Sequence, residues 1–179
     1  ETAAAVFDNM DYLARLNKAK TIWTMVRTRG KGRPVLELQK DLLLNVIREA
    51  EQRQTDLVFS ASVLMLYPTL HELPGAFNLG AHAYFLTGAG GWDGAKGTTH
   101  GSAIHKPDYI RQMCEKYGVP PAAASTNFWD IYGTTENGKA QAGPYDAAYE
   151  DFVFEIGDDV KLYVIDPISG QPAKEGEKG

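Results

Sequence analysis

The stretch Asn127-Phe-Trp-Asp-Ile-Tyr-Gly-Thr-Thr-Glu136 decides how the rest of the chain is interpreted. Its apolar first half predicts a buried strand, and its second half predicts a sharp polar loop. The loop brings an aromatic ring, a glycine, two hydroxyl groups and a carboxylate into five residues. Such groups suit a nucleotide, because the ring can stack on a base, glycine lets the backbone approach, hydroxyls bond phosphate oxygens and the carboxylate can bind Mg²⁺.

Three short apolar runs predict the strands of a sheet, at residues 57–60, 81–87 and 126–131. Helical patterns lie between them, and this alternation predicts an α/β fold with a parallel sheet flanked by helices. Ligands of such sheets bind beyond the carboxyl ends of the strands. Residues 88–91 and 132–136 each follow a strand directly. We therefore expect these two loops at the same edge of the sheet.

The helices between the strands have recognisable start and stop signals. Residues 62–73 predict a helix that bends or ends at Pro68. Residues 106–117 predict another, with Pro107 at its first turn and Gly118 as its stop.

The two ends of the chain differ from this central part. Apolar spacing predicts helices at residues 8–29 and 37–54, separated by a basic turn at 30–34. Beyond residue 145 the pattern predicts antiparallel strands at 152–156 and 160–165, with turns at 157–159 and 166–170.

Three segments follow from these patterns: a helical segment at 1–56, a parallel α/β core at 57–145, and an antiparallel β-hairpin segment at 146–179. We interpret them as one subdomain of a longer chain.

Composition narrows the class of protein. With 179 residues, 44% of them hydrophobic and 23% charged, the chain resembles an ordinary soluble globular domain. The net charge of −5 disfavours a nucleic-acid-binding protein. The apolar runs are too short to cross a membrane, and one cysteine agrees with a reducing compartment, so we expect a cytoplasmic protein.

The glycine-rich segment 87–99 does not match the two common phosphate-binding motifs. The dinucleotide fingerprint needs a third glycine where this chain has Asp93. The P-loop needs glycine and a hydroxyl residue at the positions of Ala95 and Gly97. Two interpretations remain: a small-molecule pocket lined by backbone groups with Trp92 as one wall, or a surface loop.

The Tyr-Gly-Thr-Thr-Glu sequence resembles a core motif of the adenylate-forming enzymes, the superfamily of acyl-CoA synthetases, luciferases and peptide-synthetase adenylation domains. The match to Tyr-Gly-x-Thr-Glu is at Tyr132, Gly133, Thr135 and Glu136. A glycine loop upstream and the segment 164–176 downstream also resemble this family. The Gly-Gly-Trp element is similar to the acyl-protein synthetase (LuxE-like) branch, which usually carries lysine where this chain has Asp93.

The resemblance implies part of an N-terminal domain that activates a carboxylic acid, a fatty acid among the candidates, as an acyl-adenylate. It implies ATP and Mg²⁺ as cofactors. It implies that Tyr132 packs on adenine within a nucleotide-binding loop that includes Gly133 and Thr134. It further implies that Thr135 bonds the α-phosphate, that Glu136 binds the magnesium ion, and that Gly90 and Gly91 line the adenine and acyl pocket.

The implied acyl acceptor is a thiol, either a protein cysteine or CoA, and other subunits of an acyl-transfer complex are candidate partners. The family's phosphate loop with lysine, its ribose-binding aspartate and its C-terminal catalytic lysine have no counterpart here. We therefore expect an incomplete fragment that does not turn over alone. The alternatives are a non-catalytic nucleotide-binding or scaffold domain, and a dinucleotide-dependent enzyme, which Asp93 disfavours.

Two further residue types invite functional interpretations. Cys114 could carry an acyl group in an acyl-protein synthetase, but a lone helical cysteine is typical of buried packing. His100 and His105 have a loose metal-ligand spacing without other ligands nearby, which favours surface or capping roles.

Overall fold

In a computed structural model, the structure describes residues 25–29, 35–88, 90–93, 104–134, 139–155, 163, 165 and 169–172. The chain forms two compact units, residues 1–49 and 50–179.

The first unit contains a β-hairpin. Strands β1 (Val26–Arg29) and β2 (Val35–Leu38) pair antiparallel, with Val26 opposite Leu38. The helix predicted over 8–29 is therefore wrong at residues 26–29, and its part before residue 25 lies outside the described residues. The branched residues Val26 and Thr28 favour a strand.

Helix α2 (Lys40–Arg53) begins in the first unit and ends in the second. It starts three residues later than predicted, because Leu38 belongs to β2. Its buried positions recur at spacings of three and four, as expected for one helical face: Leu43, Val46, Ile47 and Ala50.

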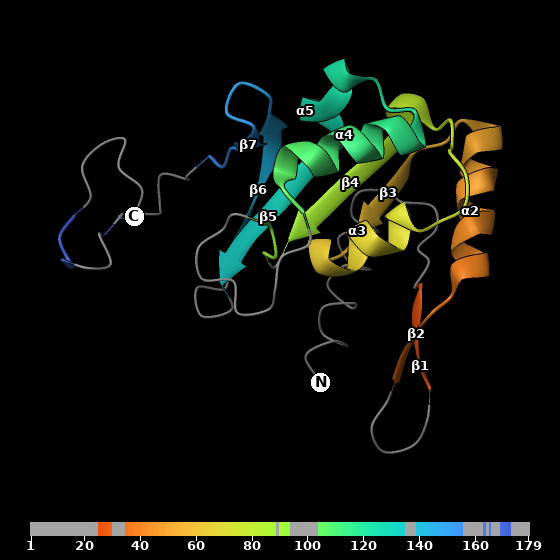
Figure 1. Cartoon of the computed structure of the whole chain (residues 1–179), viewed down its shortest axis with the longest axis horizontal. Helices are drawn as coiled ribbons and strands as arrows, with labels where there is room; N and C mark the ends of the chain where they lie inside the picture. The colour runs from red at the N-terminus through yellow and green to blue at the C-terminus, as the bar shows by residue number, and fades with distance from the viewer. Residues whose placement is uncertain are drawn as a thin grey trace. The chain divides into compact units, whose positions relative to one another are not determined.

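The second unit is built on a five-stranded mixed sheet in the order β3-β4-β5-β6-β7 (Figure 1). Its strands are β3 (Leu57–Ser60), β4 (Ala83–Gly88), β5 (Phe128–Thr134), β6 (Lys139–Asp146) and β7 (Asp151–Phe152). The first three are mutually parallel, as predicted, whereas β6 and β7 are antiparallel to their neighbours. The fold is α/β, with helices flanking an open sheet.

Helices α3 (Val63–His71) and α4 (Lys106–Tyr117) lie across one face of the sheet (Figure 1). Helix α4 has the predicted bounds, and Gly118 ends it in the left-handed conformation with φ of 69°. Helix α3 continues through Pro68 rather than ending there. Lys116 of α4 donates to the carbonyl oxygens of His71 and Leu73, and these bonds satisfy backbone acceptors at the end of α3.

Three short helices complete this unit. They are the 3₁₀ turns η1 (Gly80–His82) and η2 (Pro121–Ala123) and the single-turn helix α5 (Ala124–Asn127). Asn127 is buried, and its side-chain amide donates to the carbonyl oxygens of Ala81 and Ala83. The start of β5 is thus tied to the start of β4.

The predicted bounds of the third strand, β5, are wrong, and the fourth strand, β6, was not predicted. Residues 126 and 127 are helical, and β5 continues to Thr134. Tyr132 and Gly133, predicted in a loop, pair with Gln141 and Ala140 of β6. The cause is the unpredicted strand β6, whose alanine, glycine and proline residues carry little strand signal but extend β5 by pairing with it.

The C-terminal strands also differ from the prediction. Of residues 152–155, only Phe152 lies in a strand, and its partner is Tyr145 of β6; residue 156 lies outside the described residues. Val153 leaves the strand and crosses over Gly143, where a side chain would collide with the Val153 carbonyl. Tyr163 is not in a strand, and most of the predicted hairpin lies outside the described residues. An antiparallel bridge between Ile165 and Pro172 encloses the predicted turn at 166–170.

The core lies between the sheet and helices α3 and α4. Phe59, Phe85 and Phe128, one from each parallel strand, stack with ring centroids 5.2 and 4.6 Å apart. Tyr109 and Tyr117 of α4 are fully buried against the Phe85 ring. This aromatic layer fixes the face of the sheet on which the candidate site is built.

Candidate functional site

The two segments singled out in the sequence do meet at one edge of the sheet. Gly88, the last residue of β4, pairs with Ile131 of β5. Tyr132 is the next residue along β5, and Gly90 and Gly91 follow directly after β4. The carboxyl ends of these parallel strands therefore lie side by side, as the sequence predicted.

The two glycines after β4 have different surroundings. Gly90 is exposed with φ of 67°, and a Cβ placed on it would meet no atom of the described residues within 4 Å. Gly91 is buried with φ of 95°, and a Cβ there would lie 2.6 Å from the Leu64 Cγ of α3. Gly91 therefore packs against α3, whereas the side of Gly90 is open to a ligand.

Three polar side chains form a buried cluster behind this loop. The carboxyl group of Asp130 accepts a hydrogen bond from the Thr87 hydroxyl at 2.7 Å and another from the Trp92 indole N–H at 3.2 Å. All three residues are buried. Burial raises the pKa of Asp130, and the hydrogen bonds from Thr87 and Trp92 oppose that increase. We call Thr87, Trp92 and Asp130 the Asp130 cluster.

Sequence reasoning predicted Trp92 as a wall of a pocket but missed Thr87 and Asp130. The alternation of inward-facing residues along each strand could have indicated these two residues. Asp130 shares a strand face with buried Phe128, and Thr87 shares one with buried Phe85. A polar residue at each inward position of neighbouring strands predicts a buried hydrogen-bonded pair.

Aromatic rings from α4 and β7 contact the Trp92 indole. The Tyr109 ring lies 5.2 Å from it at 71°, and the Phe152 ring 5.5 Å from it. The Tyr109 hydroxyl is buried and has no hydrogen-bond partner among the described residues. Burial, with smaller contributions from Tyr117 and Asp130, raises the Tyr109 pKa well above its usual value. Tyr109 therefore stays neutral and serves as packing around the cluster.

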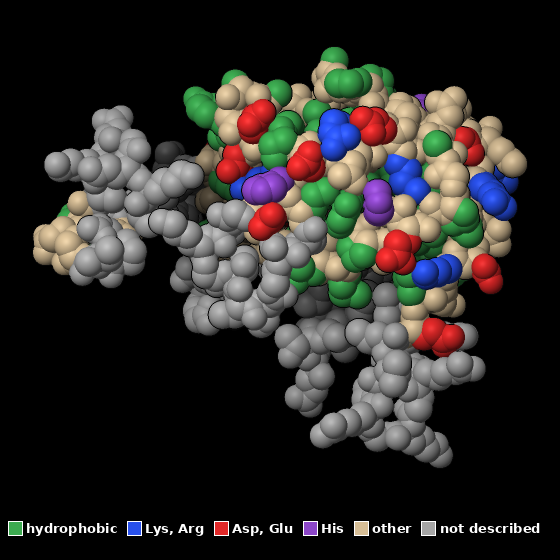
Figure 2. Space-filling view, in the orientation of Figure 1, with side chains coloured by type: hydrophobic (Ala, Val, Ile, Leu, Met, Phe, Trp, Pro, Cys, Tyr) green, Lys and Arg blue, Asp and Glu red, His purple; other side chains and the backbone are tan. Residues whose placement is uncertain are grey.

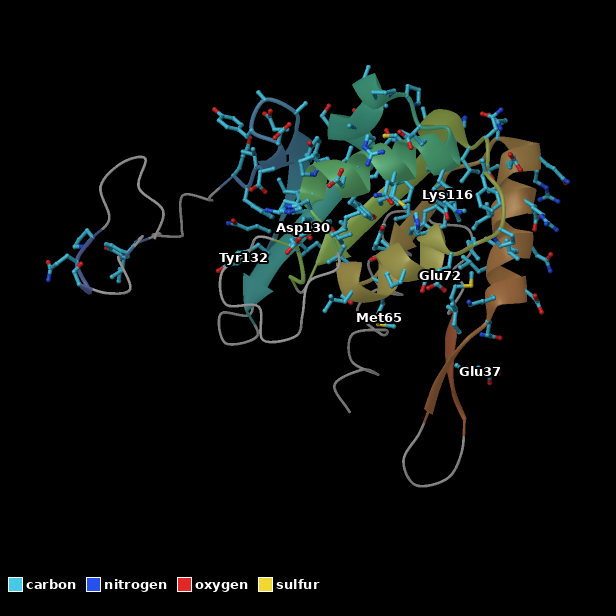
Figure 3. The ribbon with its side chains drawn as sticks, viewed as in Figure 1. Glu37, Met65, Glu72, Lys116, Asp130 and Tyr132 are labelled. Carbon is cyan, nitrogen blue, oxygen red and sulfur yellow. The ribbon has the colours of Figure 1, made fainter. Side chains whose placement is uncertain are left out.

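Tyr132 lies further along the same side of β5 as Asp130 (Figure 3). Its side chain is 64% exposed, and its ring lies 6.1 Å from that of Phe154. The ring therefore has free surface for stacking. Thr134 is the last residue of β5, while Thr135 and Glu136 lie outside the described residues. Of the predicted site residues, the structure brings together Gly90, Gly91, Tyr132 and Gly133.

The side chains considered for acyl transfer and metal binding have other surroundings. Cys114 is buried in α4, and burial raises its pKa to about 11, which disfavours the reactive thiolate. His105 precedes α4 and lies 3.3 Å from the Asp93 carboxylate. His100 lies outside the described residues. Within the described ranges, no group of three histidine, cysteine or acidic side chains could hold a metal ion.

A cavity of about 600 Å³ lies on the opposite face of the sheet. Its lining includes Trp129, Ala142 and Pro144, which alternate along β5 and β6 with the residues on the Asp130 side. None of the predicted site residues that the structure describes lines this cavity. On the face formed by α3 and α4, acidic and basic side chains are interspersed (Figure 2).

No family model, curated protein or solved structure matches this chain. In the part of the chain that the structure describes, each helix is too short or too polar to cross a lipid bilayer.

Proposed function

We propose that this chain is part of an adenylate-forming ligase that activates a carboxylic acid with ATP and transfers the acyl group to a thiol. The observation that carries the proposal is the adjacency of the glycine loop and the Tyr-Gly-Thr-Thr-Glu motif. The two are joined through the pairing of Gly88 with Ile131. A nucleotide that spans both segments would lie at the carboxyl edge of the sheet, where ligands of such folds bind.

The described residues fit the nucleotide. The exposed Tyr132 ring offers a flat face to adenine, and the open side of Gly90 admits a ligand close to the backbone. The roles of Thr135 at the α-phosphate and Glu136 at Mg²⁺ are proposed from the sequence motif alone, as is the part of Thr134 in the nucleotide loop.

The proposed reaction has two steps. A carboxylate oxygen of the acid attacks the α-phosphorus of ATP, the bond to the bridging oxygen breaks, and pyrophosphate leaves. A thiolate then attacks the acyl carbon and AMP leaves, so both steps balance without an oxidant or reductant. Positioning and charge neutralisation provide most of the catalysis in such phosphoryl chemistry. The thiol belongs to CoA or to a protein cysteine, and the buried Cys114 is a poor candidate for it.

The test is carboxylate-dependent exchange of pyrophosphate into ATP, measured on the full-length gene product with short, aromatic and long-chain acids. We expect exchange with one class of acid, and a loss of about a hundredfold or more in Glu136→Gln. Mg·ATP binding without exchange for any acid would favour the non-catalytic nucleotide-binding alternative. Failure to bind Mg·ATP, or a Glu136→Gln variant as active as the wild type, would contradict the proposal.

A further inference from the structure

We propose that Asp130 is a positioning residue, which holds the Trp92 indole and thereby fixes the described glycines of the loop after β4, Gly90 and Gly91, in their binding conformation. This inference rests on the proposed function, because it assigns that loop to the nucleotide and acyl pocket. It concerns residues outside the Tyr-Gly-Thr-Thr-Glu motif and gives the Asp130 cluster a role.

The hydrogen bonds of Asp130 connect two elements that meet at the site. One carboxyl oxygen accepts from Thr87 at the end of β4, and the other accepts from Trp92 in the loop that follows. Asp130 itself stands on β5, and the exposed fraction of the residue is 8%. A buried carboxyl group is costly unless its oxygens are bonded, so the three side chains stabilise one shared arrangement.

The indole N–H gives Trp92 a directional tie to the sheet. Tyr109 and Phe152 enclose the indole through ring contacts, and such contacts tolerate sliding of one ring over another. The hydrogen bond to Asp130 selects one position of the ring, because hydrogen bonds weaken steeply with misalignment.

Fixing Trp92 also fixes the glycines before it. The loop is tied to β5 at Gly88, which pairs with Ile131, and again at Trp92 through Asp130. Only residues 89–91 lie between these two ties, and Gly91 within them packs against Leu64. A short segment held at both ends keeps Gly90 in place before a ligand arrives, and such preorganisation increases affinity.

Asparagine and alanine at position 130 test whether hydrogen bonding by this side chain holds Trp92. Asparagine keeps an acceptor oxygen for the indole N–H, and its amide group can donate to the Thr87 hydroxyl. That hydroxyl can still donate to the Trp129 carbonyl, which lies 3.2 Å away. Alanine removes the acceptor. The matched control is Trp129→Phe, because Trp129 is the neighbour of Asp130 in sequence but lines the cavity on the opposite face.

The experiment uses the 179-residue chain labelled with 5-fluorotryptophan and ¹⁵N-glycine. The fluorine resonance of Trp92 is assigned with a Trp92→Phe variant. We expect Asp130→Ala to shift or broaden the Trp92 resonance and the Gly90 and Gly91 amide signals. Asp130→Asn should leave them at their wild-type positions, and Trp129→Phe should leave the glycine signals unchanged.

The binding measurement uses Mg·ATP as the probe. We expect Asp130→Ala and Trp92→Phe to weaken binding about tenfold, Asp130→Asn to stay within about twofold, and Trp129→Phe to bind like the wild type. If Asp130→Ala does not fold, Trp92→Phe carries the test through its glycine signals and its affinity.

Unmoved glycine signals in Trp92→Phe, or equal disturbance by Asp130→Asn and Asp130→Ala, would overturn the positioning role. If the wild type does not bind Mg·ATP, the proposed function fails. The fluorine and glycine spectra still decide whether Asp130 holds the loop, so the two failures are distinguishable.

Discussion

At the scale of single residues, the neighbouring glycines Gly90 and Gly91 differ in why a larger residue would be unfavourable. Both have positive φ, but only Gly91 faces a packed neighbour, Leu64. We expect Gly90→Ala to lower the free energy of unfolding by about 1 kcal/mol, the cost of a left-handed alanine. Gly91→Ala should cost about 2 kcal/mol or more, because the added methyl group also displaces Leu64. Urea unfolding of the two variants measures the difference, and equal losses would contradict the role of Leu64.

The buried carboxyl group of Asp130 predicts a pH dependence of stability. Burial raises its folded-state pKa above the ordinary value of 3.8. The protonated form is then favoured in the folded chain, so this contribution to stability is complete below pH 3.8 and is lost as the pH rises through the folded pKa. Asparagine does not titrate. The wild-type free energy of unfolding, relative to that of Asp130→Asn, should therefore fall as the pH rises from below 3.8 through the folded-state pKa of Asp130.

Urea titrations of both proteins across this range test the sign. A relative stability that rises with pH would show that the hydrogen bonds to Asp130 outweigh its burial.

Some site residues were predictable from the sequence and others were not. Gly90, Gly91 and Tyr132 stand out because a glycine run and an aromatic-glycine pair directly after predicted strands are local signals. Asp130 lies inside an apolar run, so its importance depends on Thr87 and Trp92, which are about forty residues away in sequence. Such long-range pairing is decided by the register of the sheet, which sequence periodicity does not specify.

At the scale of elements, the prediction succeeded where local residues determine the element and failed where strand pairing determines it. Helix α4 matches its prediction because proline at its start and glycine at its end act locally. Strands β1 and β2 were mistaken for parts of helices, because leucine and valine suit either period over four residues. Strand β6 was missed because it depends on its pairing with β5.

Helix α3 contains a proline, a residue that normally destabilises the interior of a helix. Pro68 lies inside the helix, so its nitrogen cannot donate to the Leu64 carbonyl. Pro68→Ala restores this donor and should raise the free energy of unfolding by about 1 kcal/mol, less than the full helical cost of proline because the unfolded chain also gains freedom.

Thr69→Ala is the matched control for Pro68→Ala. It improves helix propensity at the next position without restoring a hydrogen bond, and should gain only about 0.5 kcal/mol. Thermal and urea unfolding compare the two. A Pro68→Ala variant less stable than the wild type would mean that the surrounding packing requires the proline ring.

At the scale of the second unit, the two faces of the sheet differ. Helices α3 and α4 lie over the face that carries Phe59, Phe85 and Phe128, which are all buried. On the other face Val58 is 60% exposed, and Leu86 and Trp129 are only partly buried. Among the described strands, β3 lies at the edge of the sheet, and its exposed apolar side chain favours association of unfolded or partly folded chains.

This asymmetry predicts opposite responses at adjacent residues of β3. Val58→Lys should change the free energy of unfolding by less than about 0.5 kcal/mol, because its side chain is exposed. It should also slow aggregation on heating, since a charged residue on an edge strand opposes pairing with another chain. Phe59→Ala, one residue along and buried, should cost about 3 to 5 kcal/mol.

Light scattering during a thermal ramp and urea unfolding separate these two effects. A large loss of stability in Val58→Lys would mean that this face of β3 is covered in solution, so the same pair of variants reports which side of the strand the core occupies.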